Sequence, residues 1–361
     1  FDASSNFTFT SGTLRASGEI TNFYTAGAGQ AVILDSGTWA PTGNIAQASV
    51  TLLGTSNLSV GDYDASNLTF TAGTLTTTDA LTNLNTLSTG QTVALNGGTW
   101  SPTGNIEGGA VTIDHAGVLT VTDYDATHLT LTDGSLVASG TVTSLAPITA
   151  NQTVDLRSGG VLGTQTVLDG GTIGLLNPDY NTANFTFNAG SLAVSGTTAN
   201  LPALTANRTL QHLGTISAAE GIVLDGGTLA TGNALDVTNI TFTSGTLQAR
   251  APLTGLDTLN ANQTVELVNS SWSPTGNINA GTLSATQSIL EVTDIDATNL
   301  SFDQSLLRAS GTVSNFSLLN TNSTLDLQGG TLTSDITIEP IAAITGYGTV
   351  TGNVSLGQSG T

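Results

Sequence analysis

The chain is dominated by short stretches in which apolar and polar residues alternate. In "NLTFT", Leu68 and Phe70 would point to one side of a strand, and Thr69 and Thr71 would point to the other. Strict alternation over four to six residues is typical of a strand with one buried and one exposed face. The glycine that follows, Gly73, suits a bend that requires positive φ. Because helical periodicity is almost absent, the pattern predicts an all-β protein of short strands and tight turns.

These stretches belong to a longer sequence repeat. "DYDATHLTLTDGSL", which begins at Asp123, recurs as "DYDASNLTFTAGTL" from Asp62, "DYNTANFTFNAGSL" from Asp179 and "DIDATNLSFDQSLL" from Asp294. Internal repetition at a fixed period indicates a solenoid in which each repeat packs on its neighbours. Six imperfect units are predicted within one solenoid domain: 1–61, 62–122, 123–178, 179–233, 234–293 and 294–361.

Each unit divides further into sub-repeats of about 20 residues, each with short strands and a turn. We therefore expect a right-handed parallel β-helix of about 18 coils, because parallel crossovers are nearly always right-handed. Outward residues of successive coils would lie about 4.8 Å apart, where like charges repel and Thr, Ser or Asn do not. The alternation predicts one shared core formed by Leu68, Phe70, Leu75, Val93, Leu95, Val111 and Ile113.

Composition narrows the classes of function. The formal net charge is −21, only 9% of residues are charged, and there is no Lys. A chain this acidic has no basic face with which to displace counterions from phosphates, so nucleic-acid binding is excluded. The absence of Cys excludes disulfides and thiolate chemistry. No apolar run approaches the roughly 18 residues that a membrane span needs, so we expect no membrane insertion in this segment.

With this pattern, the chain resembles the large repetitive β-helical proteins of bacterial surfaces, namely autotransporter passengers and filamentous-haemagglutinin-type adhesins. The resemblance covers the whole chain as a pattern and is most specific near the C-terminus. There, "GYGTVTGN" has the G-x-G-x-V-x-G-N cadence common in such proteins, with Gly346, Gly348, Gly352 and Asn353 in the matching positions. The resemblance implies a β-helix at the cell surface or outside the cell. More chain usually follows this cadence in that family, and this chain begins without Met, so we expect a piece of a longer polypeptide.

Pairs of Asp residues are the best candidates for a metal site. They are Asp62 with Asp64, Asp123 with Asp125, and Asp294 with Asp296. Ca²⁺ takes six to eight oxygen ligands, and two carboxylates with turn carbonyls would begin such a site. The alternative is turn chemistry, in which an Asp side chain binds nearby backbone N–H groups. Asn181 in the fourth copy and the missing G-G-x-G-x-D repeat favour turn chemistry.

The three Trp residues share one motif. It reads "GTWAPTGNI" at Trp39, "GTWSPTGNI" at Trp100 and "SSWSPTGNI" at Trp272. A row of exposed indoles would form a glycan-binding platform. Alternatively, each Trp packs over the nearby proline at a corner and fills or shields the core. The recurrence of the complete motif favours the corner.

Candidate catalytic groups are few. His115, His128 and His212 are scattered and match no metal spacing. Asp169 and Asp225, in "LDGGTI" and "LDGGTL", occupy a slot that other copies fill with Asn or Gln, which indicates a turn. Glycosidases need two carboxylates at a defined separation in one cleft. The sequence therefore predicts that the protein is not an enzyme.

The functional expectation is an extracellular, rod-like structural or adhesive element without a cofactor other than possible Ca²⁺. Both ends lack a recognisable cap, and open strand edges invite pairing, so we expect a homo-oligomer or an end-to-end filament. Two alternatives stay open. One is an adhesin that binds cell-surface glycans, and the other is a β-helical polysaccharide hydrolase or lyase.

Overall fold

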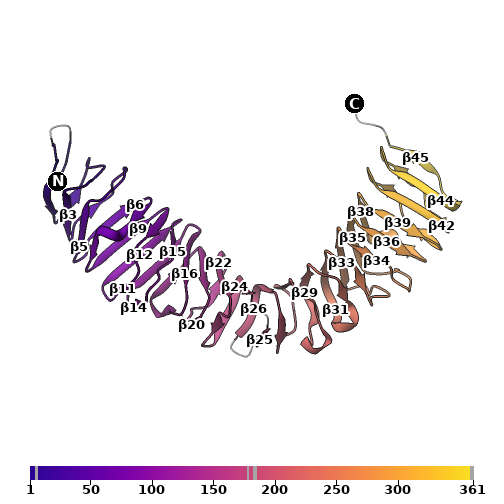
Figure 1. The fold of residues 1–361 in the computed structure, drawn as a ribbon. Helices are drawn as coiled ribbons and strands as arrows, with labels where there is room; N and C mark the ends of the chain where they lie inside the picture. Colours follow the sequence, from indigo (N-terminus) through magenta and orange to yellow (C-terminus); the bar gives the residue numbers. More distant parts are fainter. Residues whose placement is uncertain (5–6, 177–178, 182–184, 358–361) are drawn as a thin grey trace. The chain divides into compact units, whose positions relative to one another are not determined.

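The computed structural model describes residues 1–4, 7–176, 179–181 and 185–357 (Figure 1). It is 56% strand and 4% helix, and its parallel sheets stack as a β-solenoid of about 19 turns, which confirms the predicted fold class. The chain divides into two compact units. Unit 1 comprises Phe1–Asn177 and Asn184–Thr186, and unit 2 comprises Pro178–Ala183 and Phe187–Thr361. Within the described residues, no helix is long and apolar enough to cross a membrane.

Unit 1 is built mainly of three parallel sheets. The first sheet contains β1 (Gly12–Ala16), β3 (Gln30–Asp35), β5 (Ser49–Leu53) and β8 (Leu68–Phe70). The second contains β2 (Glu19–Ile20), β4 (Thr38–Trp39), β6 (Asn57–Val60), β9 (Gly73–Thr77), β12 (Gln91–Asn96), β15 (Ala110–Asp114) and β18 (Leu129–Leu131). The third contains β7 (Tyr63–Asp64), β10 (Ala80–Thr82), β13 (Thr99–Trp100), β16 (Gly117–Val121), β19 (Gly134–Ala138), β22 (Gln152–Arg157) and β24 (Thr166–Leu176).

Shorter elements complete the coils of unit 1. They are β11 (Leu87–Ser88) with β14 (Ile106–Glu107), then β17 (Tyr124–Asp125), β20 (Thr141–Thr143) and β23 (Val161–Leu162), then β21 (Ile148–Thr149), and the 3-10 helices η1 (Ala65–Asn67) and η2 (Ala126–His128). One coil visits the three sheets in turn, since β5, β6 and β7 follow each other along the chain.

Unit 2 has the same construction. One sheet contains β26 (Phe185–Val194), β28 (Arg208–His212), β29 (Val223–Thr231), β31 (Thr241–Ala249), β33 (Gln263–Val268), β35 (Thr282–Thr286) and β38 (Leu300–Asp303). A second contains β30 (Leu235–Asp236), β32 (Leu253–Thr254), β34 (Ser271–Trp272), β36 (Ile289–Val292), β37 (Ile295–Asp296), β39 (Leu306–Ala309), β40 (Thr312–Ser314), β42 (Thr324–Leu332) and β44 (Ala343–Val350). The remaining elements are β25 (Asp179–Asn181), β27 (Thr197–Ala199), β41 (Leu318–Leu319), β43 (Ile336–Ile338), β45 (Val354–Leu356), η4 (Ala218–Glu220), η5 (Val237–Asn239) and η6 (Ala297–Asn299).

A coil is slightly shorter than the sequence predicted. Leu14, Val32, Val50 and Leu68 are consecutive partners in the first sheet, so the step from coil to coil is constant along this row. The second sheet has two slightly longer steps, from Glu19 to Thr38 and from Thr38 to Asn57, and one slightly shorter step, from Asn57 to Thr74. The turns between the strands are short, so the chain completes about 19 turns instead of the predicted 18.

The first two repeats do not span a whole number of coils. Three coils from Leu14 lead to Leu68, but the residue equivalent to Leu14 in the next copy of "GTL" is Leu75. Each of these two repeats therefore exceeds three coils by a short stretch, and the next copy begins one sheet further on. Equivalent strands of the first three repeats, β1, β9 and β19, accordingly lie in the first, second and third sheets of unit 1. In unit 2, by contrast, Leu192 and its equivalent Leu247 lie three whole coils apart in one row.

The core follows the predicted alternation. Leu75, Val93, Leu95, Val111 and Ile113 are at most 1% exposed, while Thr69 and Thr71 are exposed. Leu68 and Phe70 are only half-buried, so they are less enclosed than the other five residues of the predicted core. They lie at the end of the first sheet, where β8 pairs only with β5 among the described strands.

Glutamine side chains fix the turn that precedes several core strands. In "GQAV", "GQTV" and "NQTV", the glutamine Oε1 accepts an N–H of the residue three positions earlier, and Nε2 donates to a carbonyl of the previous coil, 21 residues earlier. The residues are Gln30, Gln91, Gln152 and Gln263. Each Gln therefore joins its own turn to the preceding coil and satisfies backbone groups that the strands leave unpaired.

Charged residues that stack in unit 2 alternate in sign. Glu291, Arg308 and Asp326 are consecutive partners in β36, β39 and β42. Nη1 of Arg308 lies 2.5 Å from Oε1 of Glu291, and Nε lies 3.7 Å from Oδ2 of Asp326. The hydrogen bond from Arg308 lowers the pKa of Glu291. This arrangement follows from the short spacing between coils, which makes like charges repel.

We expect substitutions in unit 1 to destabilise it in proportion to burial. Leu95→Ala should lower the free energy of unfolding by about 2 to 5 kcal/mol, because it opens a cavity in a packed row. Phe70→Ala should cost less than Leu95→Ala, since Phe70 is only half-buried. Denaturant unfolding monitored by circular dichroism measures both variants, with exposed Thr69→Ala as the control. Equal losses for all three variants would contradict the shared core.

Candidate functional site

The first Asp of each predicted pair joins one coil to the next. Oδ1 of Asp62 accepts the backbone N–H of Ala80 at 2.9 Å. Asp123 and Asp294 bond in the same way to the N–H groups of Thr141 and Thr312, at 2.6 and 2.5 Å. In all three cases the acceptor and the donor are 18 residues apart. The carboxylate thus extends the backbone hydrogen bonding between stacked coils.

The second Asp of each pair begins a 3-10 helix in its own coil. Asp64, Asp125 and Asp296 are N-cap residues, and their carboxylates accept the backbone N–H two residues later. A side chain of the next coil adds a further bond, from Asn83 to Asp64 at 2.8 Å and from Asn315 to Asp296 at 2.9 Å.

These hydrogen bonds lower the pKa of the capping carboxylates. For Asp64 the main cause is the bond from Asn83. For Asp125 and Asp296 it is the hydroxyl two residues later. Asp236 follows the same rule, with Thr238 as the main cause. Hydrogen bonds to the charged form stabilise that form, so the four caps stay ionised in acid below the ordinary range for Asp.

The surroundings of the Asp pairs are those of hydrogen-bonded turns. Their partners are N–H and O–H donors, whereas Ca²⁺ requires a shell of oxygen ligands. Among the residues that the structure describes, no group of three or more His, Cys, Asp or Glu lies close enough to hold a metal ion. The geometry favours turn chemistry, and Ca²⁺ binding stays a prediction. The corresponding side chain of Asn181 lies outside the described part.

The three Trp residues occupy buried corners. Trp39 is 2% exposed, and Trp100 and Trp272 are each 1% exposed. Each indole N–H donates to a carbonyl 16 residues earlier, that of Phe23, Leu84 or Leu256, at 2.7 to 2.8 Å. The glycine of the motif approaches the same turn, since the N–H groups of Gly43, Gly104 and Gly276 donate to carbonyls of the previous coil.

The Trp residues do not form a row. In unit 1, Trp39 lies in the second sheet and Trp100 in the third, because the repeat advances by one sheet. Their burial and their N–H bonds correspond to the corner alternative of the sequence analysis. Glycan binding by these three residues stays a prediction, but the structure offers no exposed face of Trp100 or Trp272 for stacking.

The histidines differ from one another in environment. His115 and His128 are exposed, and His115 contacts Asp114 at 3.2 Å. His212 is completely buried in unit 2, and its Nε2 lies 2.9 Å from Oε2 of Glu220. Because an ionised carboxylate only accepts hydrogen bonds, Nε2 carries the proton. Nδ1 of His212 has no hydrogen-bond partner among the described residues.

Glu220 accepts several bonds inside the coil stack. Oε2 also accepts from the backbone N–H and the hydroxyl of Thr198, both at 3.2 Å, and Oε1 accepts the N–H of Ser217 at 2.8 Å. Burial raises the pKa of Glu220, but the bonds from Ser217, His212 and Thr198 outweigh it, so the pKa is lowered overall. The pair is inaccessible to solvent, which suits a structural role and gives no access to a substrate.

Sequence analysis missed this pair, although two signals mark it. His212 occupies the column that holds Leu34, Leu95, Leu156 and Leu267 in other strands with the pattern V-x-L, so a polar ring replaces an inward leucine. In addition, "SAAEG" has the S-x-x-E spacing of a capping box, followed by a glycine. That glycine, Gly221, ends η4 in the left-handed conformation.

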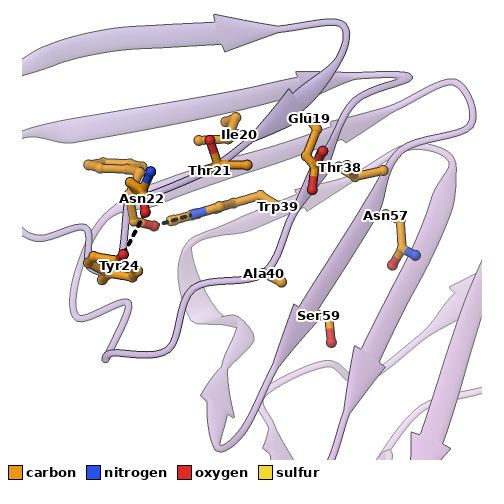
Figure 2. Close-up of a pocket in the computed structure, with 11 residues that line it drawn as sticks. Glu19, Ile20, Thr21, Asn22, Tyr24, Thr38, Trp39, Ala40, Asn57 and Ser59 are labelled. Atoms are coloured by element: carbon orange, nitrogen blue, oxygen red, sulfur yellow. Dashed lines mark hydrogen bonds between the residues drawn. The ribbon is translucent and has the colours of Figure 1, made fainter. Parts of the chain in front are cut away.

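An open cleft lies over β2, β4 and β6 of unit 1 (Figure 2). Its volume is about 260 Å³, and Trp39 contributes to its floor. In Figure 2, Asn22 and Tyr24 lie on one side of Trp39, and Glu19, Thr38, Asn57 and Ser59 lie on the other. The Tyr24 hydroxyl donates to Oδ1 of Asn22 at 2.6 Å. The Tyr24 side chain is 52% exposed, so one wall of the cleft is an accessible aromatic ring.

Comparison of the chain with models of known protein families, with characterised proteins and with solved structures finds no match.

We expect the Asp caps to make the protein sensitive to acid. The pKa values of the caps are lower in the folded than in the unfolded state. Their contribution to folding stability is therefore complete above the unfolded pKa of about 4 and is lost as the pH falls through the folded pKa. Asp64→Asn keeps an effective cap at neutral pH but does not titrate. The melting temperature of Asp64→Asn should therefore fall less than that of the wild type between pH 5 and pH 2.

Exposed Asp169→Asn, which caps no helix, is the matched control for this measurement. If the melting temperature of Asp64→Asn falls in parallel with that of the wild type, the caps do not cause the acid sensitivity. The same melting experiment with a chelator at neutral pH addresses Ca²⁺. A melting temperature that falls on chelation would overturn turn chemistry as the sole role of the Asp pairs.

Glu220→Ala should destabilise unit 2 strongly. The substitution removes the acceptor for His212, Thr198 and Ser217 and leaves buried donors unpaired, at a cost of about 3 to 5 kcal/mol. Thermal and denaturant unfolding measure the change, and exposed Glu107→Ala should alter stability by less than about 0.5 kcal/mol. A Glu220→Ala variant as stable as the control would mean that the buried pair contributes nothing.

Proposed function

We propose that this protein acts outside the cell as an elongated structural or adhesive element. The observation that carries the proposal is that the recurring polar residues are used to join coils. The Asp pairs, the Gln residues before the core strands and the Trp corners all bond to backbone groups of the same or a neighbouring coil. The repeated chemistry thus maintains a long regular surface.

The same use of polar groups supports the expectation that the chain is not an enzyme. Asp169 and Asp225, the carboxylates considered for polysaccharide cleavage, are exposed, and they lie at bulges within β24 and β29 and not in the turns that the sequence predicted. Asp225 accepts a hydrogen bond from the Ser244 hydroxyl at 2.9 Å. A glycosidase needs a carboxyl group held in a cleft with a raised pKa beside a second carboxylate. The two Asp residues occupy equivalent bulged positions in strands of different units, so the repeat accounts for both of them.

More specifically, the proposed role is that of a surface or matrix protein of the autotransporter-passenger or filamentous-haemagglutinin type. The solenoid of stacked coils and the cadence that ends in Gly352 and Asn353 support it. Secretion to the cell surface is part of this proposal.

End-to-end assembly is a further part of the proposal. Among the described strands, β44 pairs only with β42, and β45 pairs only with β43. Tyr347 and Leu356 on these strands are 74% and 80% exposed. Unpaired, apolar strand edges are templates for another strand, and head-to-tail contacts that do not close produce filaments.

Surface labelling and imaging test the proposal together. An antibody against the protein should label the exterior of intact source cells, and negative-stain electron microscopy should show thin particles that lengthen with concentration. A charged edge variant, Tyr347→Lys with Leu356→Lys, should stop the lengthening. Labelling confined to permeabilised cells, or turnover of a polysaccharide panel lost on Asp169→Asn or Asp225→Asn, would overturn the extracellular structural or adhesive role.

A further inference from the structure

We propose that the cleft over β2, β4 and β6, called the Tyr24 cleft, binds a single unit of a neutral saccharide. The inference deepens the adhesive form of the proposed function and rests on it. The cleft combines an exposed aromatic ring with a wall of polar side chains, and its volume of about 260 Å³ lies just below the range usual for drug-sized ligands. A space of this size suits one sugar ring, while the adjacent units of the saccharide stay in solvent.

The polar wall is formed by neighbouring rows of the second sheet. Glu19, Thr38 and Asn57 are consecutive partners in β2, β4 and β6, so their outward side chains lie side by side (Figure 2). Ser59 follows two residues after Asn57 on the same face. Within the described part of the chain, none of these four side chains forms a hydrogen bond. Their carboxylate, amide and hydroxyl groups are therefore available to the hydroxyls of a sugar.

The aromatic wall supplies the apolar contact. Tyr24 is held by its hydroxyl, which donates to Asn22, and Asn22 in turn donates to Asp2 at 2.7 Å. A positioned ring that is 52% exposed loses little conformational freedom when a ligand packs on its face. The C–H face of a pyranose ring is apolar while its rim is polar, so it matches an aromatic wall opposite hydrogen-bonding groups.

The sequence departs from its own repeat at this cleft. Tyr24 occupies the column of Asn85, Ala146, Pro202, Asp257 and Ser317. Glu19 occupies the column of Ala80, Thr141 and Thr312, and Asn57 that of Val118 and Ile289. Packing between coils does not require these residues, because the other copies form the same strands without them. Three departures from the repeat thus meet on one surface.

Charge limits the ligand to neutral sugars. Glu19 places a carboxylate in the cleft, and the chain has a formal net charge of −21. Both repel sialylated or uronic-acid saccharides. An open cleft that contacts one sugar ring gives weak binding, with a dissociation constant on the order of 1 mM, and an array of copies would strengthen it by multivalency.

Saturation-transfer difference NMR with the full chain tests the site, with lactose, maltose and cellobiose as neutral probes and sialyllactose as the anionic counterpart of lactose. At least one neutral probe should bind. If lactose is a probe that binds, sialyllactose should bind at least about tenfold more weakly than lactose. Tyr24→Ala should weaken binding by about tenfold. Val161→Ala, which truncates another exposed apolar side chain of unit 1, should leave binding unchanged.

The outcomes separate this site from the wider proposal. Neutral binding that survives Tyr24→Ala, or that Val161→Ala abolishes equally, would overturn the Tyr24 cleft while leaving an adhesive role in place. No binding of any neutral probe at millimolar concentration would also overturn the site, and surface labelling would then decide the structural role alone. Circular dichroism and melting temperature establish that Tyr24→Ala is folded, and Glu19→Ala with Asn57→Ala supplies a second variant that should weaken binding.

Discussion

The structure depends on one constraint: each coil must return its backbone to hydrogen-bonding register with the coil before it. The pairings that define the sheets are parallel, and the step from coil to coil is almost constant. Inward Val and Leu side chains on consecutive coils then form continuous rows that are almost completely buried. The turns absorb small differences in length without changing this register, since Ile20 and its partner Trp39 are both buried although the step between them is one of the longer ones. The polar residues of the repeat act at this point, because Asp, Gln and Trp side chains bond the turns to the neighbouring coil.

The difference between the repeat and the coil distributes the motifs over the surface. The first two repeats each exceed three coils by a short stretch, as the positions of Leu68 and Leu75 show, so the first three copies present their strands in successive sheets of unit 1. The same residue types must therefore fit each sheet in turn. This requirement explains why Thr, Ser and Asn are common outside and why charges that do stack alternate in sign, as in the row that contains Arg308. It also prevents equivalent residues, such as Trp39 and Trp100, from forming one row.

Departures from the repeat have two different consequences. His212 and Glu220 place a hydrogen-bonded polar pair inside the stack, where an uncompensated group would be costly. Glu19, Tyr24 and Asn57 instead place unusual groups on the outside, around a cleft. The first departure affects the stability of unit 2, and the second creates a surface chemically unlike the rest of the repeat. The residues that follow the repeat serve to stack the coils. Specific binding of a ligand therefore depends on residues that depart from the repeat.

The sequence alone determined the class of fold, because alternation with period two and regularly placed glycines allow little else. It identified the fully buried positions Leu75, Val93 and Leu95, and it indicated that the Asp pairs and the Trp motif favour turns and corners. The tertiary structure decided which sheet each copy enters, since that depends on whether a repeat spans three whole coils or slightly more. It also decided that Phe70 is only half-buried, that Glu220 meets His212, and that Glu19, Tyr24 and Asn57 border one cleft. These contacts join residues from different strands and turns, and only the length of every intervening turn brings them together.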